Sequence, residues 1–179
     1  MLRTTLATAA ALIALTAFPA PPIAAQDADD HPIVGVWSLD QDRSSYQPGP
    51  GPQGIRRHFR MDDDGYLVSV RITIAPNGNP TFAMSRARLD GGDYPVWTNG
   101  HVYAALSGDD ISAGTASFES VDERTLRLTQ KNPQGDVTPV GPSMWVVSAD
   151  GSTLTVTTTG TNGNGAEVHN VEVYRRLEN

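Results

Sequence analysis

The sequence predicts an all-β fold: a single antiparallel up-and-down β-barrel of about eight to ten short strands. Short segments in which apolar and polar residues alternate follow one another along the chain, as in strands with one buried face. Turn signals of the Asn-Gly and Asp-Gly kind separate these segments. No stretch of a dozen residues carries an apolar stripe of helical period. A meander this long that stayed open would leave two exposed edges, so closure into a barrel is favoured.

Residues 1–25 (MLRTTLATAAALIALTAFPAPPIAA) carry one charge, then a weakly apolar run, then a Pro-rich end at Ala24-Ala25. This order is typical of a cleaved signal peptide, and cleavage after Ala25 is expected. The run from Thr4 to Ala17 is shorter than the roughly 20 apolar residues of a membrane-spanning helix, so no membrane insertion is expected. The sequence therefore predicts a periplasmic or secreted protein.

The remaining chain is long enough for one domain with its own core. Residues 26–32 (QDADDHP) are expected to form a flexible lead-in, and residues 33–179 the barrel domain. Removal of the leader would change the net charge from −7 to −8, because it contains one Arg and no acidic residue. A negative surplus repels phosphate backbones, so nucleic acid is not an expected partner. The chain has no Cys, which excludes disulfides and a lipid-anchored Cys.

The elements follow in order after a first strand in HPIVGVWSLD (31–40). The stretch SSYQPGPGPQG (44–54) alternates Pro and Gly and is expected to be a long connection or a lid. The alternating segments are IRRHFRM (55–61), YLVSVRITI (66–74), TFAMSRARL (81–89), TLRLTQK (125–131), VTPVGPSMWVVS (137–148), TLTVTTTG (153–160) and VHNVEVYRRL (168–177). The turn signals are Asp64-Gly65, Asn77-Gly78, Gly91-Gly92, Gly108-Asp109, Gly135-Asp136, Asp150-Gly151 and 162–165.

A basic stripe lies on the segment 55–61, where His58 stands between Arg56 and Arg60. It either lines a pocket for an anionic group or is solvated. The opposite face carries Ile55 and Phe59, so the alternation favours a solvated stripe.

The segment 81–89 places large side chains on one face: Phe82, Met84, Arg86 and Arg88. Apolar bulk with a few polar groups is typical of a ligand-lining face. An ordinary filled core would suit the same pattern, and the residues do not decide between them.

The segment YPVWTNGHVY (94–103) gathers aromatic residues beside a turn, among them Tyr94, Trp97 and Tyr103. Such residues either rim a barrel mouth and stack on a ligand or form cross-strand pairs in a plain hairpin. Met144 and Trp145 occupy opposite faces of their strand, so at least one should be internal.

Catalytic and metal-binding signatures are absent from the sequence. The four His residues have no ligand spacing, and no nucleophile elbow or phosphate-binding loop occurs. No metal or cofactor is expected on these grounds. Acid–base chemistry by Glu172 with Tyr174, or by His58, stays open because such chemistry needs one well-placed pair.

The first and last strands resemble those of a known family. Gly35-Val36-Trp37 looks like the G-x-W of lipocalins and fatty-acid-binding proteins, and VEVYRRLEN (171–179) is similar to their final strand. LDGGDYPV (89–96) and residues 148–165 resemble bacterial exported lipocalin-like domains of unassigned function. The resemblance implies a barrel with Trp37 packed across one end and Arg175 or Arg176 lying over its indole.

The same resemblance bears on the ligand. Fatty-acid-binding proteins hold a carboxylate with an Arg and a Tyr two residues apart near the chain end, and these positions match Glu172 and Tyr174 here. The charge is reversed, so either an internal Arg pairs with Glu172 or the ligand offers a donor or a cation. A haem-binding barrel subfamily uses a His on a late strand, which points to His169, but its other signatures are absent.

The sequence thus predicts an exported lipocalin-like barrel that binds a small, mostly hydrophobic molecule. The alternatives are a cofactor-free enzyme (isomerase, cyclase or hydrolase) acting on a hydrophobic substrate in the same barrel, and an envelope domain whose barrel is filled by side chains. The predicted ligand-binding residues are Phe82, Met84, Arg86, Arg88, Tyr94, Trp97, Tyr103, Trp145, Glu172 and Tyr174.

Overall fold

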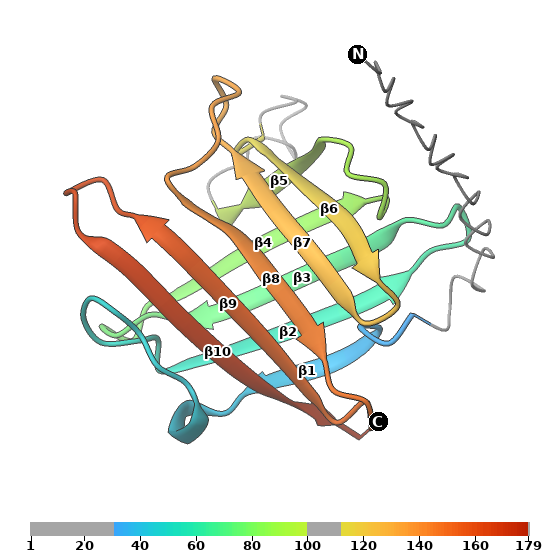
Figure 1. Cartoon of the computed structure of the whole chain (residues 1–179), viewed down its shortest axis with the longest axis horizontal. Coiled ribbons are helices and arrows are strands. Elements are labelled where there is room, and N and C mark those ends of the chain that lie inside the picture. The colour runs from blue at the N-terminus through green and yellow to red at the C-terminus, as the bar shows by residue number, and fades with distance from the viewer. Residues whose placement is uncertain (1–30, 100–111, 179) are drawn as a thin grey trace, which may run out of the picture.

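The structure, a computed structural model, describes residues 31–99 and 112–178. Within these ranges ten antiparallel strands form a closed barrel, in which each strand pairs with its neighbours in sequence and β10 pairs with β1 (Figure 1). The strands are β1 (Gly35–Leu39), β2 (Gly54–Met61), β3 (Leu67–Ile74), β4 (Pro80–Ala87), β5 (Tyr94–Thr98), β6 (Thr115–Asp122), β7 (Thr125–Lys131), β8 (Val140–Val147), β9 (Thr153–Thr161) and β10 (Glu167–Leu177). A 3-10 turn, η2 (Gln41–Arg43), follows β1. The predicted all-β up-and-down barrel is confirmed.

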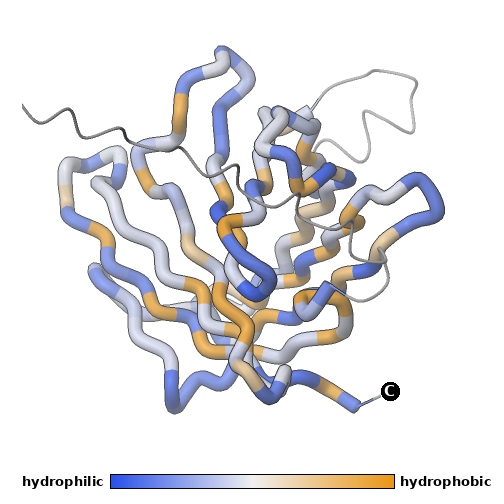
Figure 2. The backbone as a smooth tube through the Cα atoms, turned by 45° about the vertical axis from the view of Figure 1, so that its right-hand side comes forward, coloured by the Kyte–Doolittle hydropathy of each residue, from blue (hydrophilic) through white to orange (hydrophobic). Residues whose placement is uncertain are grey.

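Most hairpins use the predicted turn residues. The β6–β7 hairpin instead turns at Glu123 and Arg124, and Gly108-Asp109 lies outside the described residues. Gly65 donates its N–H to the carbonyl of Asp62 at 2.9 Å and has a φ of 77°, a left-handed conformation that suits glycine. The carboxylate of Asp62 also accepts the backbone N–H of Tyr66 at 2.9 Å. In Figure 2 hydrophilic residues gather in such loops, whereas hydrophobic and hydrophilic residues alternate along the strands.

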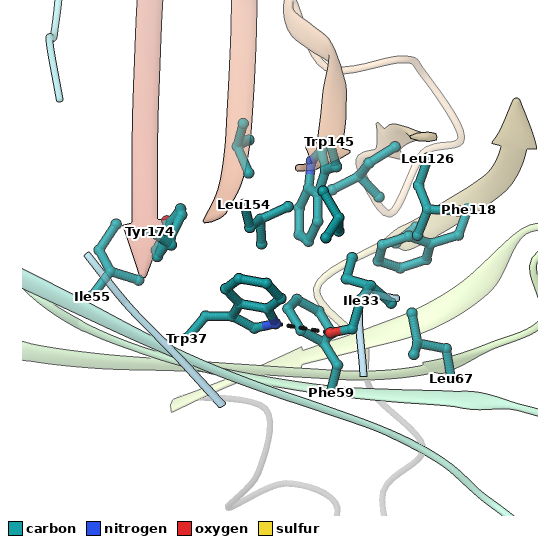
Figure 3. Close-up of a cluster of buried hydrophobic side chains, with 14 of the residues drawn as sticks. Ile33, Trp37, Ile55, Phe59, Leu67, Phe118, Leu126, Trp145, Leu154 and Tyr174 are labelled. Carbon is teal, nitrogen blue, oxygen red and sulfur yellow. Dashed lines mark hydrogen bonds between the residues drawn. The ribbon is translucent and has the colours of Figure 1, made fainter. Parts of the chain in front are cut away.

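One end of the barrel is closed by apolar side chains around Trp37 (Figure 3). The Trp37 side chain is 0% exposed, and its indole N–H donates to the carbonyl of Ile33 at 2.8 Å. The other large, fully buried side chains are Ile33, Phe59, Leu67, Leu126, Leu154 and Tyr174. We call Trp37 and these side chains the Trp37 plug. Their packing confirms that the indole of Trp37 lies across one end of the barrel, as the resemblance implied.

Arg176 covers the Trp37 plug from β10. Its guanidinium lies 4.2 Å from the centre of the indole ring, within the range of a cation–π interaction. It also donates hydrogen bonds to the carbonyls of Pro32, Val34 and Gly151. Of the two Arg residues that the resemblance implied, Arg176 is therefore the one over the indole.

The stretch 44–54, predicted as a connection or a lid, continues along β10 after η2. Ser45 exchanges backbone hydrogen bonds with Val171 at 2.8 and 2.9 Å, and the carbonyl of Gln47 accepts the N–H of His169 at 2.9 Å. The segment thus extends the pairing of β1 with β10 and places Tyr46 beside the barrel interior near Glu172.

On β3 and β4 polar residues face the barrel interior, and apolar residues that usually face inward lie on the outer face. Ser69 and Arg71 on β3 and Ser85 on β4 line the barrel interior. Ile72, on the opposite face of β3, is 48% exposed. These two strands give the interior a polar wall above the Trp37 plug.

Candidate functional site

Above the Trp37 plug a buried network joins β2 to β10. The Arg57 side chain donates from Nε to the Tyr174 hydroxyl at 2.9 Å and from Nη2 to the Glu172 carboxylate at 3.1 Å. The Tyr174 hydroxyl donates to the same carboxylate at 2.5 Å. Arg57 is 5% exposed, and a buried charge needs such partners. The expected internal Arg that pairs with Glu172 is therefore Arg57.

Trp145 packs against this network from β8. Its ring lies 4.6 Å from the Arg57 guanidinium carbon. Phe59 and Phe118 meet the ring edge-on, with centroids at 5.6 and 5.7 Å. The Trp145 N–H is buried and has no hydrogen-bond partner in residues 31–99 and 112–178.

Both tyrosines near Glu172 stay protonated at neutral pH. Burial raises the pKa of the Tyr174 phenol well above its usual value; the Arg57 charge opposes this rise, and the Glu172 carboxylate adds to it. Burial, followed by the charge of Glu172, also raises the pKa of Tyr46. The buried Tyr46 hydroxyl makes no hydrogen bond of normal geometry within the described part of the chain.

A cavity of about 40 Å³ lies beside this network. Its apolar wall consists of Ala83, Met84, Val96, Ala116, Phe118, Leu128 and Trp145. Its polar wall consists of Arg57, Ser69, Arg71, Ser85 and Gln130. Gln130 is an exposed residue, so the cavity reaches the surface there. A mixed wall of this kind suits a small amphipathic group.

Arg71 differs from Arg57 in having no partner. No hydrogen bond or ion pair joins its side chain to another described residue, although it faces Arg57 in the register of β2 and β3. Burial, and after it the positive charge of Arg57, lowers the pKa of Arg71, while Glu172 acts in the opposite direction. The cavity therefore contains one compensated and one uncompensated guanidinium.

The structure brings together three of the predicted ligand-binding residues. Trp145, Glu172 and Tyr174 all surround Arg57. Only Trp145 lines the cavity itself, because Glu172 and Tyr174 are engaged with each other and with Arg57. Tyr103 lies outside the described residues.

The large side chains of β4 point away from the interior, because the small residues Ala83 and Ser85 take the inner face. Arg86 donates to the carboxylates of Asp62 and Asp64 at 2.6 and 2.8 Å and is exposed. Phe82, Arg86 and Arg88 therefore do not line this cavity, and their part in ligand binding stays a prediction. Of the side chains predicted to share this face, only Met84 borders the cavity.

Arg88 and Tyr94 belong to a cluster around Tyr66. The guanidinium carbons of Arg86 and Arg88 lie 3.7 and 4.4 Å from the centre of the Tyr66 ring. Tyr94 meets that ring edge-on and donates its hydroxyl to Asp90 at 3.0 Å. Trp97 lies opposite Met84 in the register of β4 and β5 and is half-buried. None of Arg86, Arg88, Tyr94 and Trp97 is in the cavity wall.

The histidines lie outside the cavity wall where the structure describes them. His58 is exposed between the exposed Arg56 and Arg60, so the basic stripe is solvated, as the alternation favoured. His169 is exposed as well. Within the described ranges no group of His, Cys, Asp and Glu is arranged to hold a metal ion. In the same ranges no helix is long and apolar enough to span a membrane.

Sequence reasoning missed Arg71, Ser69 and Ser85 as site residues. The signal was present in the spacing, since Ser69 and Arg71 share a face of an otherwise Val- and Ile-rich segment. Which face of β3 lies inside is set by strand pairing around the whole barrel, and this cannot be read from the segment alone. Its apolar residues favoured the opposite face as the internal one.

The sequence matches no protein-family model, and no curated protein matches it. Among solved structures, the crystal structure of Rv2717c from M. tuberculosis is similar, with 14% sequence identity and a TM-score of 0.45. The similarity covers 82% of this chain and 94% of that chain. A likeness of this degree carries no information about the ligand or the activity.

Proposed function

We propose that the protein is a binding module that takes part of a small molecule into the barrel from the side opposite the Trp37 plug. The observation that supports this most is the cavity beside Trp145, where an apolar wall stands against a polar wall. Among the described residues, neither Arg71 in the polar wall nor the buried Trp145 N–H has a hydrogen-bond partner. Buried polar groups are normally satisfied, so an interior with free donors favours a ligand over a filled core.

The size of the cavity limits how the ligand sits. A volume of about 40 Å³ holds a few non-hydrogen atoms, given that one water needs roughly 10–15 Å³ by this measure. Pockets that enclose a whole drug-sized ligand measure about 300–1,000 Å³. The ligand would therefore seat its polar end in the cavity and keep its mostly hydrophobic body at the mouth near Gln130.

Glu172 and Tyr174 fit a structural role better than an acid–base role. Each is satisfied by the other and by Arg57, and the Tyr174 phenol is held in its protonated form. No arrangement among the described residues favours the enzyme alternative over binding.

We also propose that the protein is exported, on the strength of the leader-like order of residues 1–25. The mass of the chain isolated from the envelope or medium of its host tests this, because the processed chain would begin at Gln26. A mass that includes Met1 would contradict it.

Binding is tested with the uncharged fluorescent probe N-phenyl-1-naphthylamine. We expect fluorescence enhancement with the unchanged protein and about tenfold weaker binding with Ala83→Leu, which fills the cavity wall. Thr129→Leu adds a similar apolar group on β7 between the inward Leu128 and Gln130, and should change affinity less than about twofold. No binding to the unchanged protein, or equal binding to Ala83→Leu, would contradict the proposal.

A further inference from the structure

The charges that face the barrel interior do not balance. Arg57 and Arg71 both line the cavity, and the described part of the cavity wall contains no Asp or Glu. The nearby carboxylate of Glu172 is bound to Arg57 at 3.1 Å and also accepts the Tyr174 hydroxyl. The interior therefore holds two positive charges and one negative charge, and the charge of Arg71 has no counter-ion among the described residues.

The position of Arg71 makes this surplus costly. Arg57 and Arg71 are direct cross-strand neighbours on β2 and β3, and like charges opposite each other are destabilising. Arg does not lose its proton at ordinary pH, so Arg71 cannot relieve the repulsion by becoming neutral. A partner of opposite charge that enters the cavity would remove the cost.

The surroundings of Arg71 suit an oxyanion. Ser69 and Ser85 lie opposite each other in the register of β3 and β4, and both line the cavity. Neither hydroxyl is hydrogen-bonded within residues 31–99 and 112–178. Hydroxyl donors and a planar guanidinium together match the oxygens of a carboxylate.

We propose that Arg71, with Ser69 and Ser85, binds an anionic end group of the ligand, so that the ligand class is a small organic acid with an apolar body. This inference rests on the proposed binding function and adds the charge of the ligand to it. The cavity volume of about 40 Å³ accommodates a carboxylate, with its few non-hydrogen atoms. This carboxylate site is separate from Tyr174 and Glu172, because Arg57 already occupies them.

The test compares two probes with the same alkyl body and end groups of similar size, one anionic and one neutral. Hexanoate and hexanamide have the same body, and each is titrated into the ¹⁵N-labelled full chain while the side-chain Nε–H signal of Arg71 is followed. We expect hexanoate to bind at least about tenfold more tightly than hexanamide and to shift the Arg71 signal. This comparison needs no variant and does not depend on the folding of one.

The variants assign the difference to Arg71. Arg71→Gln should reduce the affinity for hexanoate about tenfold and leave that for hexanamide within twofold. Arg71→Lys keeps the charge and should retain a preference for hexanoate. Arg60→Gln removes a cation from the exposed face of β2 and should leave both affinities unchanged, which excludes a general effect of net charge.

The outcomes separate the two proposals. Equal affinity for both probes, or hexanoate binding that survives Arg71→Gln, would overturn the carboxylate site while leaving the binding function in place. If neither hexanoate nor hexanamide binds, the carboxylate site is overturned, and the binding function fails as well only when N-phenyl-1-naphthylamine does not bind the unchanged protein. Hexanoate binding that is lost equally in Arg60→Gln and Arg71→Gln would also overturn the assignment to Arg71.

Discussion

At the scale of single residues, Gly35, Trp37 and Arg176 form one packing unit. A Cβ atom at Gly35 would lie 2.5 Å from Nη1 of Arg176 and would clash with it. Because Gly35 has no side chain, Arg176 reaches over the indole of Trp37 and still donates to the carbonyl of Val34. The Gly of the G-x-W motif therefore makes room for the Arg of the last strand.

Gly35→Ala should destabilise the protein by about 2 kcal/mol, because it displaces Arg176 and forces Ala into a rarely adopted conformation. The φ of Gly35 is 136°. Urea denaturation followed by Trp fluorescence measures the change in the free energy of unfolding. Gly54→Ala is the matched control, since a Cβ there meets nothing within 4 Å. Equal stability of the two variants would contradict this role for Gly35.

At the scale of elements, β2 and β10 are joined on the inside of the barrel across β1. Both strands pair with β1, and Arg57 of β2 reaches Glu172 and Tyr174 of β10. The contact lies where the first and last parts of the chain meet to close the barrel (Figure 1). It therefore adds a side-chain link to the backbone pairing that completes the sheet.

Glu172→Gln should lower the free energy of unfolding by about 3 kcal/mol, because it leaves Arg57 as a buried charge without a counter-ion. Glu119→Gln breaks an ion pair with Arg127 whose side chains are 50% and 45% exposed, and should cost less than about 1 kcal/mol. Chemical denaturation of both variants gives the comparison. Similar losses in the two variants would show that the buried pair is no more important than a surface pair.

The alternation along the chain was enough to predict most strands and hairpins, although β6 was not among the predicted segments. Period-2 patterns and turn glycines are local signals, and the barrel realises them in β2, β3, β7, β9 and β10. The G-x-W motif and the basic final strand likewise predicted the contact between Trp37 and an Arg of β10. These features depend on neighbours in sequence or on a family resemblance.

The direction in which β3 and β4 face could not be predicted in this way. Hydrophobicity favours Val68, Val70 and Ile72 inside, yet Ser69 and Arg71 line the interior. A one-residue change of register exchanges the two faces of a strand, and the register here is set by pairing around the whole barrel. The site was therefore predicted in part, from Met84 and from residues of β8 and β10, and it was missed at Ser69, Arg71 and Ser85.

At the scale of the whole molecule, the barrel has one apolar, closed end and a polar interior above it. The Trp37 plug and Arg176 close the first end, while Arg57 and Arg71 place positive charge in the interior of a chain whose net charge is −7. Under the proposed carboxylate site, we expect this interior charge to attract the anionic end of a small ligand, whereas the net negative charge of the chain repels anions outside the barrel.

Native mass spectrometry of the protein purified from its own host tests this account most directly. A co-purifying organic acid should appear as an added mass on the folded chain, and it should be absent from Arg71→Gln purified in the same way. The denatured extract identifies the released acid. A folded chain with the mass of the bare polypeptide and no organic acid in the extract, or a bound molecule without an acidic group, would contradict the account.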